Sequence, residues 1–168
     1  GSSHTIRAML GAVASLKKGN RPLVLAARNV HKAFIYACAA LDIDTQWIYP
    51  AEFNHLCSCE ISAADVEKAL RECSTKPDAV YITSPDYLGN ISDVFEISKV
   101  CKKYDVPLLV DNAHGAYLGF LKESLHPIHL GATACCDSAH KTLPVLTGGA
   151  YLHIAKEYSY LYSDAKEA

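Results

Sequence analysis

Short, continuously apolar segments alternate along this chain with longer segments whose apolar residues recur every three or four positions, and this alternation constrains the fold most strongly. Continuously apolar strands are buried on both faces, which is typical of a parallel sheet covered by helices on each side. We therefore predict the α/β class, a three-layer α/β/α architecture with a mostly parallel sheet. The predicted strands are Leu23–Ala27, Thr45–Tyr49, Ala79–Thr83, Val106–Val110, Thr133–Cys136 and Gly149–Ile154.

Capping residues indicate where the intervening helices begin and end. A first helix, capped by Ser3, is predicted to run to Lys17 and to end at Gly19-Asn20. The other predicted helical segments are His31 to Leu41, Ser62 to Glu72, Ser92-Asp93 to Tyr104, a turn or short helix at Pro127 to Gly131, and a polar helix from about Lys156.

Composition and charge exclude several classes of protein. The 168 residues are 50% hydrophobic and 20% charged with a net charge of −2, which suits one globular core. The longest apolar runs, such as Ala33 to Leu41, are far shorter than the roughly 20 residues of a membrane span. Since no basic cluster is denser than Lys102-Lys103, we expect neither nucleic acid nor a membrane as a partner.

The seven cysteines indicate a reducing compartment. Most of them lie inside apolar helix or strand patterns, where a thiol behaves as a small hydrophobic group: Cys38, Cys73, Cys101 and Cys135. Cys57-Ser58-Cys59 and Cys135-Cys136 each resemble half of a zinc site, but neither has a second pair at ligand spacing. We expect a cytoplasmic protein without a metal site.

Four predicted strands end in polar residues that are capable of binding or catalysis. In chain order these are Arg28-Asn29-Val30-His31, Thr83-Ser84-Pro85, Asp111-Asn112-Ala113-His114-Gly115 and Asp137-Ser138-Ala139-His140-Lys141. Because the carboxyl ends of parallel strands lie at one end of a sheet, these residues are expected to meet there. Ser2 and Ser3 at the start of the first helix add hydroxyls and backbone amides that suit a phosphate.

This set of groups matches the requirements of pyridoxal 5'-phosphate. The cofactor needs a lysine that forms an imine with its aldehyde and an anion that keeps its pyridine nitrogen protonated, and Lys141 and Asp111 meet these needs. His31 is placed to cover the ring. Ser2, Ser3 and Ser138 are available for the phosphate. Taken singly, an aspartate after a strand is usually a helix cap and a lysine in a loop is usually solvated, so the prediction depends on their convergence.

Four motifs in the same order resemble the pyridoxal-phosphate-dependent Orn/Lys/Arg decarboxylase family, which has the aspartate aminotransferase fold (fold type I). The most specific is Ser138-Ala139-His140-Lys141, which is similar to the family's S-x-H-K. The other motifs are Asp111 to Ala116, similar to D-E-A-H-G-A; Arg28 to Lys32, similar to R-N-x-H-K; and Thr83 to Gly89, similar to T-S-P-x-Y-x-G. The chain departs from the family at Asn112, where an acidic residue is usual, and over Leu143 to Gly149.

The resemblance implies roles for individual residues. It implies that Lys141 carries the internal aldimine, that Asp111 binds the pyridinium nitrogen and that His31 stacks on the ring, so these three are the catalytic candidates. It further implies that Ser138 and His140 contact the cofactor phosphate. The full expected cofactor-binding set is Ser2, Ser3, His31, Ser84, Asp111, His114, Ser138, His140 and Lys141.

The resemblance also implies an activity: decarboxylation of arginine, lysine or ornithine in polyamine biosynthesis, by a homodimer or higher homo-oligomer. Two alternatives stay open, an aminotransferase or lyase of the same fold and a non-catalytic fragment. Residues 1–168 are expected to form part of the large cofactor-binding domain, without the preceding segment and the C-terminal small domain. The chain alone is therefore expected to be a poor catalyst.

Overall fold

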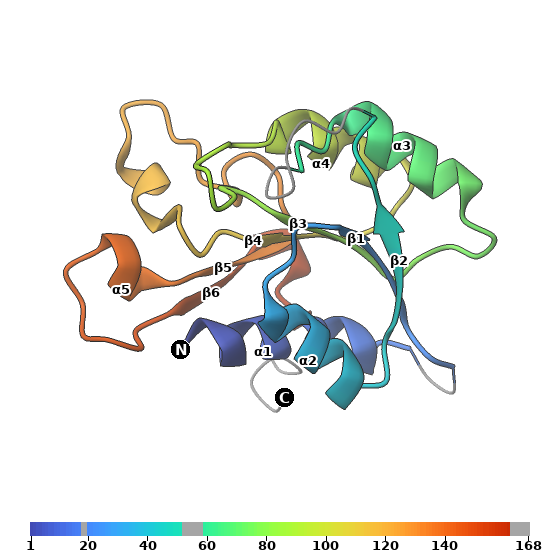
Figure 1. The fold of residues 1–168 in the computed structure, drawn as a ribbon, viewed down its shortest axis with the longest axis horizontal. Coiled ribbons are helices and arrows are strands. Elements are labelled where there is room, and N and C mark those ends of the chain that lie inside the picture. Colours follow the sequence, from blue (N-terminus) through green and yellow to red (C-terminus); the bar gives the residue numbers. More distant parts are fainter. Residues whose placement is uncertain (18–19, 52–58, 162–168) are drawn as a thin grey trace.

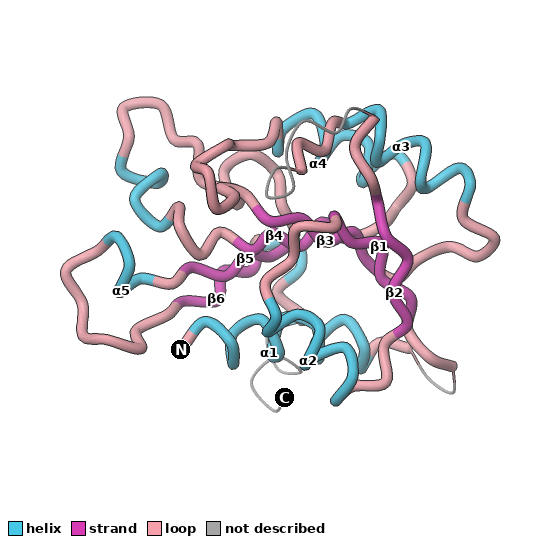
Figure 2. Tube along the Cα trace, viewed as in Figure 1, coloured by secondary structure: helices cyan, strands magenta, loops and turns pink. Residues whose placement is uncertain are grey.

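A six-stranded sheet lies between two layers of helices, as Figures 1 and 2 show. The computed structural model describes residues 1–17, 20–51 and 59–161. Within them the strand order is β2-β1-β3-β4-β5-β6, and the pairings among the first five strands are parallel, while β6 runs antiparallel to β5. The predicted three-layer architecture with a mostly parallel sheet is confirmed.

Each predicted strand overlaps an observed one. The strands are β1 (Leu23–Ala27), β2 (Asp44–Ile48), β3 (Ala79–Thr83), β4 (Leu108–Asp111), β5 (Ala134–Asp137) and β6 (Tyr151–Ile154). The central strands β3, β4 and β5 are buried along their whole length, in agreement with their continuously apolar sequences. β2 lies at the edge of the sheet and alternates between exposed and covered residues.

Two pairs of helices cover the two faces of the sheet. The helices α1 (Ser2–Ser15) and α2 (Lys32–Ala40) pack on one face, and α3 (Ala63–Glu72) and α4 (Val94–Lys103) pack on the other. Three short helical segments complete the description: η1 (Ala116–Phe120), α5 (Ala139–Thr142) and η2 (Lys156–Tyr158). In the described part of the chain, no helix has both the length and the apolar character needed to cross a membrane.

Side-chain caps confirm three of the predicted helix starts. Ser62 and Asp65 form a reciprocal capping box at α3, and Asp93 accepts a hydrogen bond from the backbone N–H of Glu96 at α4. His31 caps α2 by accepting from the N–H of Ala33 at 3.1 Å. These contacts stabilise each helix start by about 1 kcal/mol.

The predictions for both ends of the chain need correction. Ser3 is not the N-cap of α1: the cap is Gly1, whose carbonyl accepts from the N–H groups of His4 and Thr5, so Ser3 lies within the first turn. The helix also ends at Ser15 rather than Lys17. The predicted polar helix from Lys156 begins as the short segment η2. Gly19, Cys57-Ser58 and residues 162–168 lie outside the described residues.

The register of the parallel strands brings their last residues to one end of the sheet, which we call the carboxyl end. Thr83 is aligned with Asp111, and Asp111 with Cys136, while Asp137 at the end of β5 is aligned with Tyr151 of β6. The start of α1 lies at the same end, beside α5 and β6 in Figure 1. The fold thus brings the ends of β3, β4 and β5 to the same end of the sheet, although Thr83 and Cys136 are more than fifty residues apart in the sequence.

Candidate functional site

Asp111 is a carboxylate held deep at the carboxyl end of the sheet. Its side chain is buried and accepts hydrogen bonds from the N–H of Ala113, the Tyr81 hydroxyl at 3.3 Å and the Cys136 thiol at 3.4 Å. Burial raises the pKa of Asp111, and these three hydrogen bonds offset only part of that effect. A cation placed at this carboxylate would therefore be strongly favoured.

Lys141 and His114 meet at the same end of the sheet. The Nζ of Lys141, exposed on α5, lies 3.1 Å from Nε2 of His114, although 27 residues separate the two in the chain. Burial lowers the pKa of His114, and the nearby positive charge of Lys141 lowers it further, while Asp111 acts in the opposite direction. Tyr87 lies against His114 with ring centroids 5.6 Å apart. The imidazole is thus kept uncharged beside the lysine.

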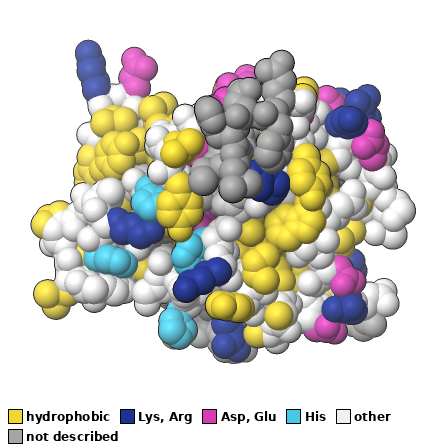
Figure 3. Space-filling model, viewed as in Figure 1, with side chains coloured by type: hydrophobic (Ala, Val, Ile, Leu, Met, Phe, Trp, Pro, Cys, Tyr) yellow, Lys and Arg dark blue, Asp and Glu magenta, His cyan; other side chains and the backbone are white. Residues whose placement is uncertain are grey.

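Polar groups gather where the start of α1 approaches the loop that follows α5. The Ser138 hydroxyl lies 3.3 Å from Nδ1 of His140, and that nitrogen lies 3.1 Å from the carbonyl oxygen of Gly149. Gly1 approaches the neighbouring Gly148 so closely that a Cβ on Gly1 would lie 3.3 Å from the Gly148 carbonyl oxygen. The start of α1 therefore lies beside the loop whose Gly149 carbonyl oxygen contacts His140. Figure 3 shows histidine and basic side chains gathered over this part of the molecule.

His31 and Ser3 line a shared pocket of about 390 Å³ between α1 and α2. The contact between the His31 imidazole and the Ala33 amide fixes the ring at the end of β1, within electrostatic range of Asp111 and His114. Ser84 differs from the other candidates. Its hydroxyl accepts the N–H of Ser92 at 3.0 Å and so holds the loop that precedes α4.

The sequence did not reveal the residues that support these groups. Tyr81 appeared only as a member of an apolar strand and Cys136 only in a strand and in a cysteine pair, yet both donate hydrogen bonds to Asp111. The register provides the signal that could have found Cys136, since it is aligned with Asp111 on the neighbouring strand. Tyr87 stands within the Thr83 to Gly89 motif, and its contact with His114 depends on tertiary structure.

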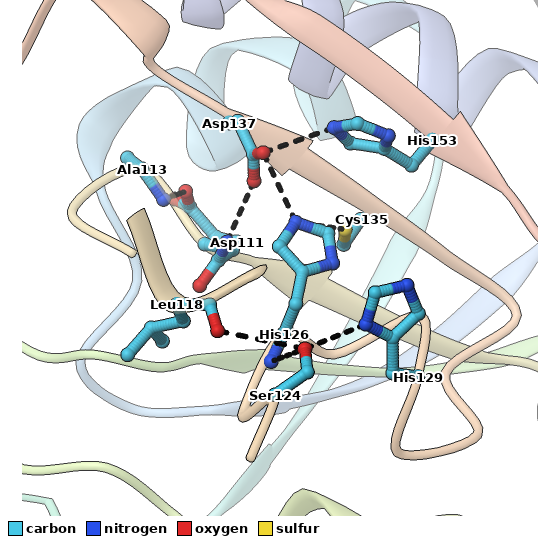
Figure 4. A network of polar contacts seen from close by, with 10 residues as sticks. Asp111, Ala113, Leu118, Ser124, His126, His129, Cys135, Asp137 and His153 are labelled. Carbon is cyan, nitrogen blue, oxygen red and sulfur yellow. Dashed lines mark hydrogen bonds and ion pairs between the residues drawn. The ribbon is translucent and has the colours of Figure 1, made fainter. Parts of the chain in front are cut away.

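A second polar network lies beside this site and is centred on Asp137 (Figure 4). The Asp137 carboxylate accepts hydrogen bonds from His126 at 3.0 Å, His153 at 2.9 Å and the side-chain amide of Asn112 at 2.6 Å. Burial acts to raise the pKa of Asp137, but these hydrogen bonds outweigh it and hold the pKa below its ordinary value. Asn112 stands where the family usually has an acidic residue, and here its amide is a hydrogen-bond donor to Asp137.

Gly115 is required by close packing next to the site. A Cβ at this position would overlap the Asn112 side chain and would lie 2.7 Å from Cδ of Pro85. We expect Gly115→Ala to lower the free energy of unfolding by about 1–3 kcal/mol, as overpacking does. At Gly119 the nearest atoms to a Cβ lie 3.7 Å away, so Gly119→Ala should change that free energy by less than about 0.5 kcal/mol. Urea denaturation compares the two, and equal losses would contradict this packing explanation.

The donor set fits pyridoxal phosphate. The buried Asp111 carboxylate suits a protonated pyridine nitrogen, because burial without a full positive partner raises its pKa. Lys141 supplies an exposed amine beside an uncharged imidazole. The Ser138 hydroxyl and the backbone amides at the start of α1 are groups that suit a phosphate dianion. These three features lie at one end of one sheet.

Comparison with known proteins identifies related sequences. A family model described as "Orn/Lys/Arg decarboxylase, major domain" matches residues 1–167. The chain is 32% identical over 158 residues to an arginine decarboxylase of Bacillus subtilis, covering 92% of this chain and 31% of that protein. It is also 32% identical over 137 residues to the uncharacterized protein YaaO of Bacillus subtilis, covering 78% of this chain and 28% of that protein. The chain spans about a third of the length of these relatives.

A solved structure shares the fold. The structure of Oryza sativa TDC with PLP and tryptamine superposes with a TM-score of 0.73 over 96% of this chain and 37% of that one, at 18% sequence identity. At this identity the likeness establishes the fold alone.

Proposed function

The chain belongs to the Orn/Lys/Arg decarboxylase family, and from this premise we propose that it forms the cofactor-binding part of a pyridoxal-phosphate-dependent decarboxylase of arginine, lysine or ornithine. The observation that supports the proposal most strongly is the contact between Lys141 and His114. It lies at the end of the sheet where Asp111 is buried. An amine and a buried carboxylate are the groups that this chemistry requires of the protein.

Lys141 and Asp111 have complementary roles in the proposed site. When bound, pyridoxal phosphate supplies an aldehyde that condenses with amines and a ring that withdraws electrons from the substrate's Cα. Lys141 offers the amine, and the uncharged His114 accepts a hydrogen bond from it. Asp111 holds a proton on the ring nitrogen through a charge-assisted hydrogen bond, while Tyr81 and Cys136 keep its carboxylate in place.

The remaining candidates position the cofactor. Ser138, His140 and the first-turn residues Ser2 and Ser3 are the groups that would take the phosphate. His31 is held by its capping hydrogen bond, so its ring can cover the cofactor without losing side-chain entropy on binding. Ser84 contributes indirectly, because its hydroxyl is engaged with the loop before α4.

We further propose that the complete enzyme is a cytoplasmic homo-oligomer in which other segments bind the substrate. The matched relatives are about three times as long as this chain, and we place the residues that recognise the amino acid largely outside residues 1–168. The described cysteines are all free, which supports a reducing compartment.

A product assay with separate substrates tests the proposed reaction. The full-length protein is supplied with pyridoxal phosphate and, in turn, with carboxyl-labelled arginine, lysine or ornithine. We expect labelled CO₂ and the corresponding amine in equal amounts from one of the three. A keto acid formed without CO₂ would instead identify an aminotransferase, and the absence of CO₂ with all three would reject the proposed substrate class.

A further inference from the structure

Four side chains with metal-binding atoms converge on the face of the sheet opposite the Tyr81 and Cys136 side. Cys135 and Asp137 are two residues apart on β5 and therefore point to the same face. His153 is aligned with Cys135 on the antiparallel strand β6, so its side chain projects to that face as well. His126 reaches the same point from the loop between η1 and β5 (Figure 4).

The separations between these atoms are close to those of a tetrahedral metal site. Nε2 of His126 and Nε2 of His153 lie 3.0 Å and 2.9 Å from the same oxygen of Asp137, and Sγ of Cys135 lies 4.0 Å from Nε2 of His126. Zinc bonds of about 2.0 Å to nitrogen and oxygen and about 2.3 Å to sulfur imply ligand separations of about 3.3–3.6 Å. Each of these three pairs would reach this range after a shift of about half an ångström or less, and the ligand atoms of His126, Cys135 and Asp137 all lie within 4.8 Å of one another.

We propose that His126, Cys135, Asp137 and His153 form a binding site for one Zn²⁺ ion. The donor set of two imidazoles, one thiolate and one carboxylate is of the mixed nitrogen, sulfur and oxygen type that zinc prefers. Two anionic ligands and two neutral imidazoles also balance the charge of the ion. On binding, the Cys135 thiol releases its proton to solvent, and each imidazole keeps one proton on Nδ1 while Nε2 binds the metal.

The surroundings of the cluster suit a metal site. Cys135, His126 and Asp137 are buried, whereas 39% of the His153 side chain is exposed, so an ion can enter past His153. A pocket of about 250 Å³ lined by His126, Asp137 and His153 opens on that side. Asn112 donates to the Asp137 oxygen that the histidines do not contact, which orients the carboxylate as outer hydrogen bonds do at known metal sites.

The proposed ion would join three parts of the fold. It would tie the loop that carries His126 to both β5 and β6, at the point where β5 leads into α5 and Lys141. The proposal does not depend on the decarboxylase assignment, since none of the four ligands is among the groups proposed to hold the cofactor. The test can therefore be made without pyridoxal phosphate.

Metal titration of the full-length protein, purified without a polyhistidine tag and stripped with a chelator, provides the test. We expect one Zn²⁺ per chain by calorimetry with Zn²⁺ alone. Titration with Co²⁺ alone should give the visible bands of a tetrahedral complex and a near-ultraviolet band from thiolate-to-metal charge transfer. The charge-transfer band should disappear in Cys135→Ala, and Zn²⁺ affinity should fall by at least about tenfold in His153→Ala.

Matched variants separate a site from general loss of structure. Cys38→Ala removes a buried thiol from α2, and His129→Ala removes an imidazole whose ring centroid lies 5.7 Å from that of His126. Both should keep the stoichiometry and the cobalt spectrum. Because the His153 side chain is partly exposed, His153→Ala is expected to fold, and circular dichroism verifies this. Binding well below one ion per chain, or a charge-transfer band that survives Cys135→Ala, would overturn the proposal.

Discussion

Lys141→Ala is expected to abolish covalent attachment of pyridoxal phosphate to the protein and to lower turnover by at least about a thousandfold. Lys141 is the lysine whose amine lies at the carboxyl end of the sheet against His114. Its removal eliminates the only group that we propose to hold the aldehyde covalently. Borohydride reduction of the loaded full-length protein, followed by peptide mass spectrometry, measures the attachment directly.

The control for this experiment is Lys99→Ala. Lys99 lies on α4, where its exposed amine pairs with Glu96, so its loss should leave both attachment and turnover unchanged. If the Lys141 variant still carries the reduced cofactor at another lysine, the assignment of Lys141 is wrong. If the variant fails to fold, circular dichroism reports this separately from loss of attachment.

Asp111→Asn should leave cofactor binding detectable but lower turnover by at least about a hundredfold. The amide cannot carry the negative charge that holds a proton on the pyridine nitrogen, so the ring withdraws electrons less effectively. The substitution is nearly isosteric, and Tyr81 and Cys136 still have an oxygen to which they can donate. Steady-state kinetics together with the visible spectrum of the loaded protein separates loss of turnover from loss of binding.

Asp78→Asn is the matched control for the Asp111 substitution. Asp78 precedes β3 at the opposite end of the sheet, where it pairs with Lys17 and accepts the N–H of Leu23. We expect Asp78→Asn to lower stability without a comparable loss of turnover. Unchanged turnover in Asp111→Asn would refute the proposed role of Asp111.

The strands and most helix starts were predictable because local sequence determines them. Ala79 to Ile82 is a short apolar run followed by Thr83-Ser84-Pro85, and this pattern favours a strand buried on both faces. Ser62 and Asp65 form a capping box that is visible as a spacing of three residues. The prediction that Ser3 caps α1 was wrong because a serine near a helix start can occupy either the cap or the first turn. The Gly1 carbonyl accepts the first hydrogen bonds of the helix, so Gly1 is the cap and Ser3 lies in the first turn.

Only those residues of the candidate site that directly follow a strand were predictable from the sequence. Asp111 and Lys141 follow buried strands, so parallel pairing alone predicts their convergence. The contact of His114 with Lys141 and the donation from Tyr81 to Asp111 depend on side-chain packing between distant segments. No local pattern encodes such contacts.

The proposed zinc ligands were missed for a related reason. Cysteine pairs such as Cys135-Cys136 are visible as a spacing in the sequence, whereas these four ligands come from one strand, its antiparallel neighbour and a loop. His126 stands before Pro127 in a segment predicted only as a turn, and His153 stands in a strand without polar neighbours in the sequence. The antiparallel register of β5 and β6 places His153 beside Cys135, and this pairing is not visible in the sequence.

The hydrogen bond between Asn112 and Asp137 makes these two positions a single unit of sequence change. An acidic residue at 112, which is usual in the family, would face the Asp137 carboxylate across a buried contact and repel it. The neutral amide of Asn112 therefore allows this chain to keep an anion at position 137, where the proposed zinc site needs one.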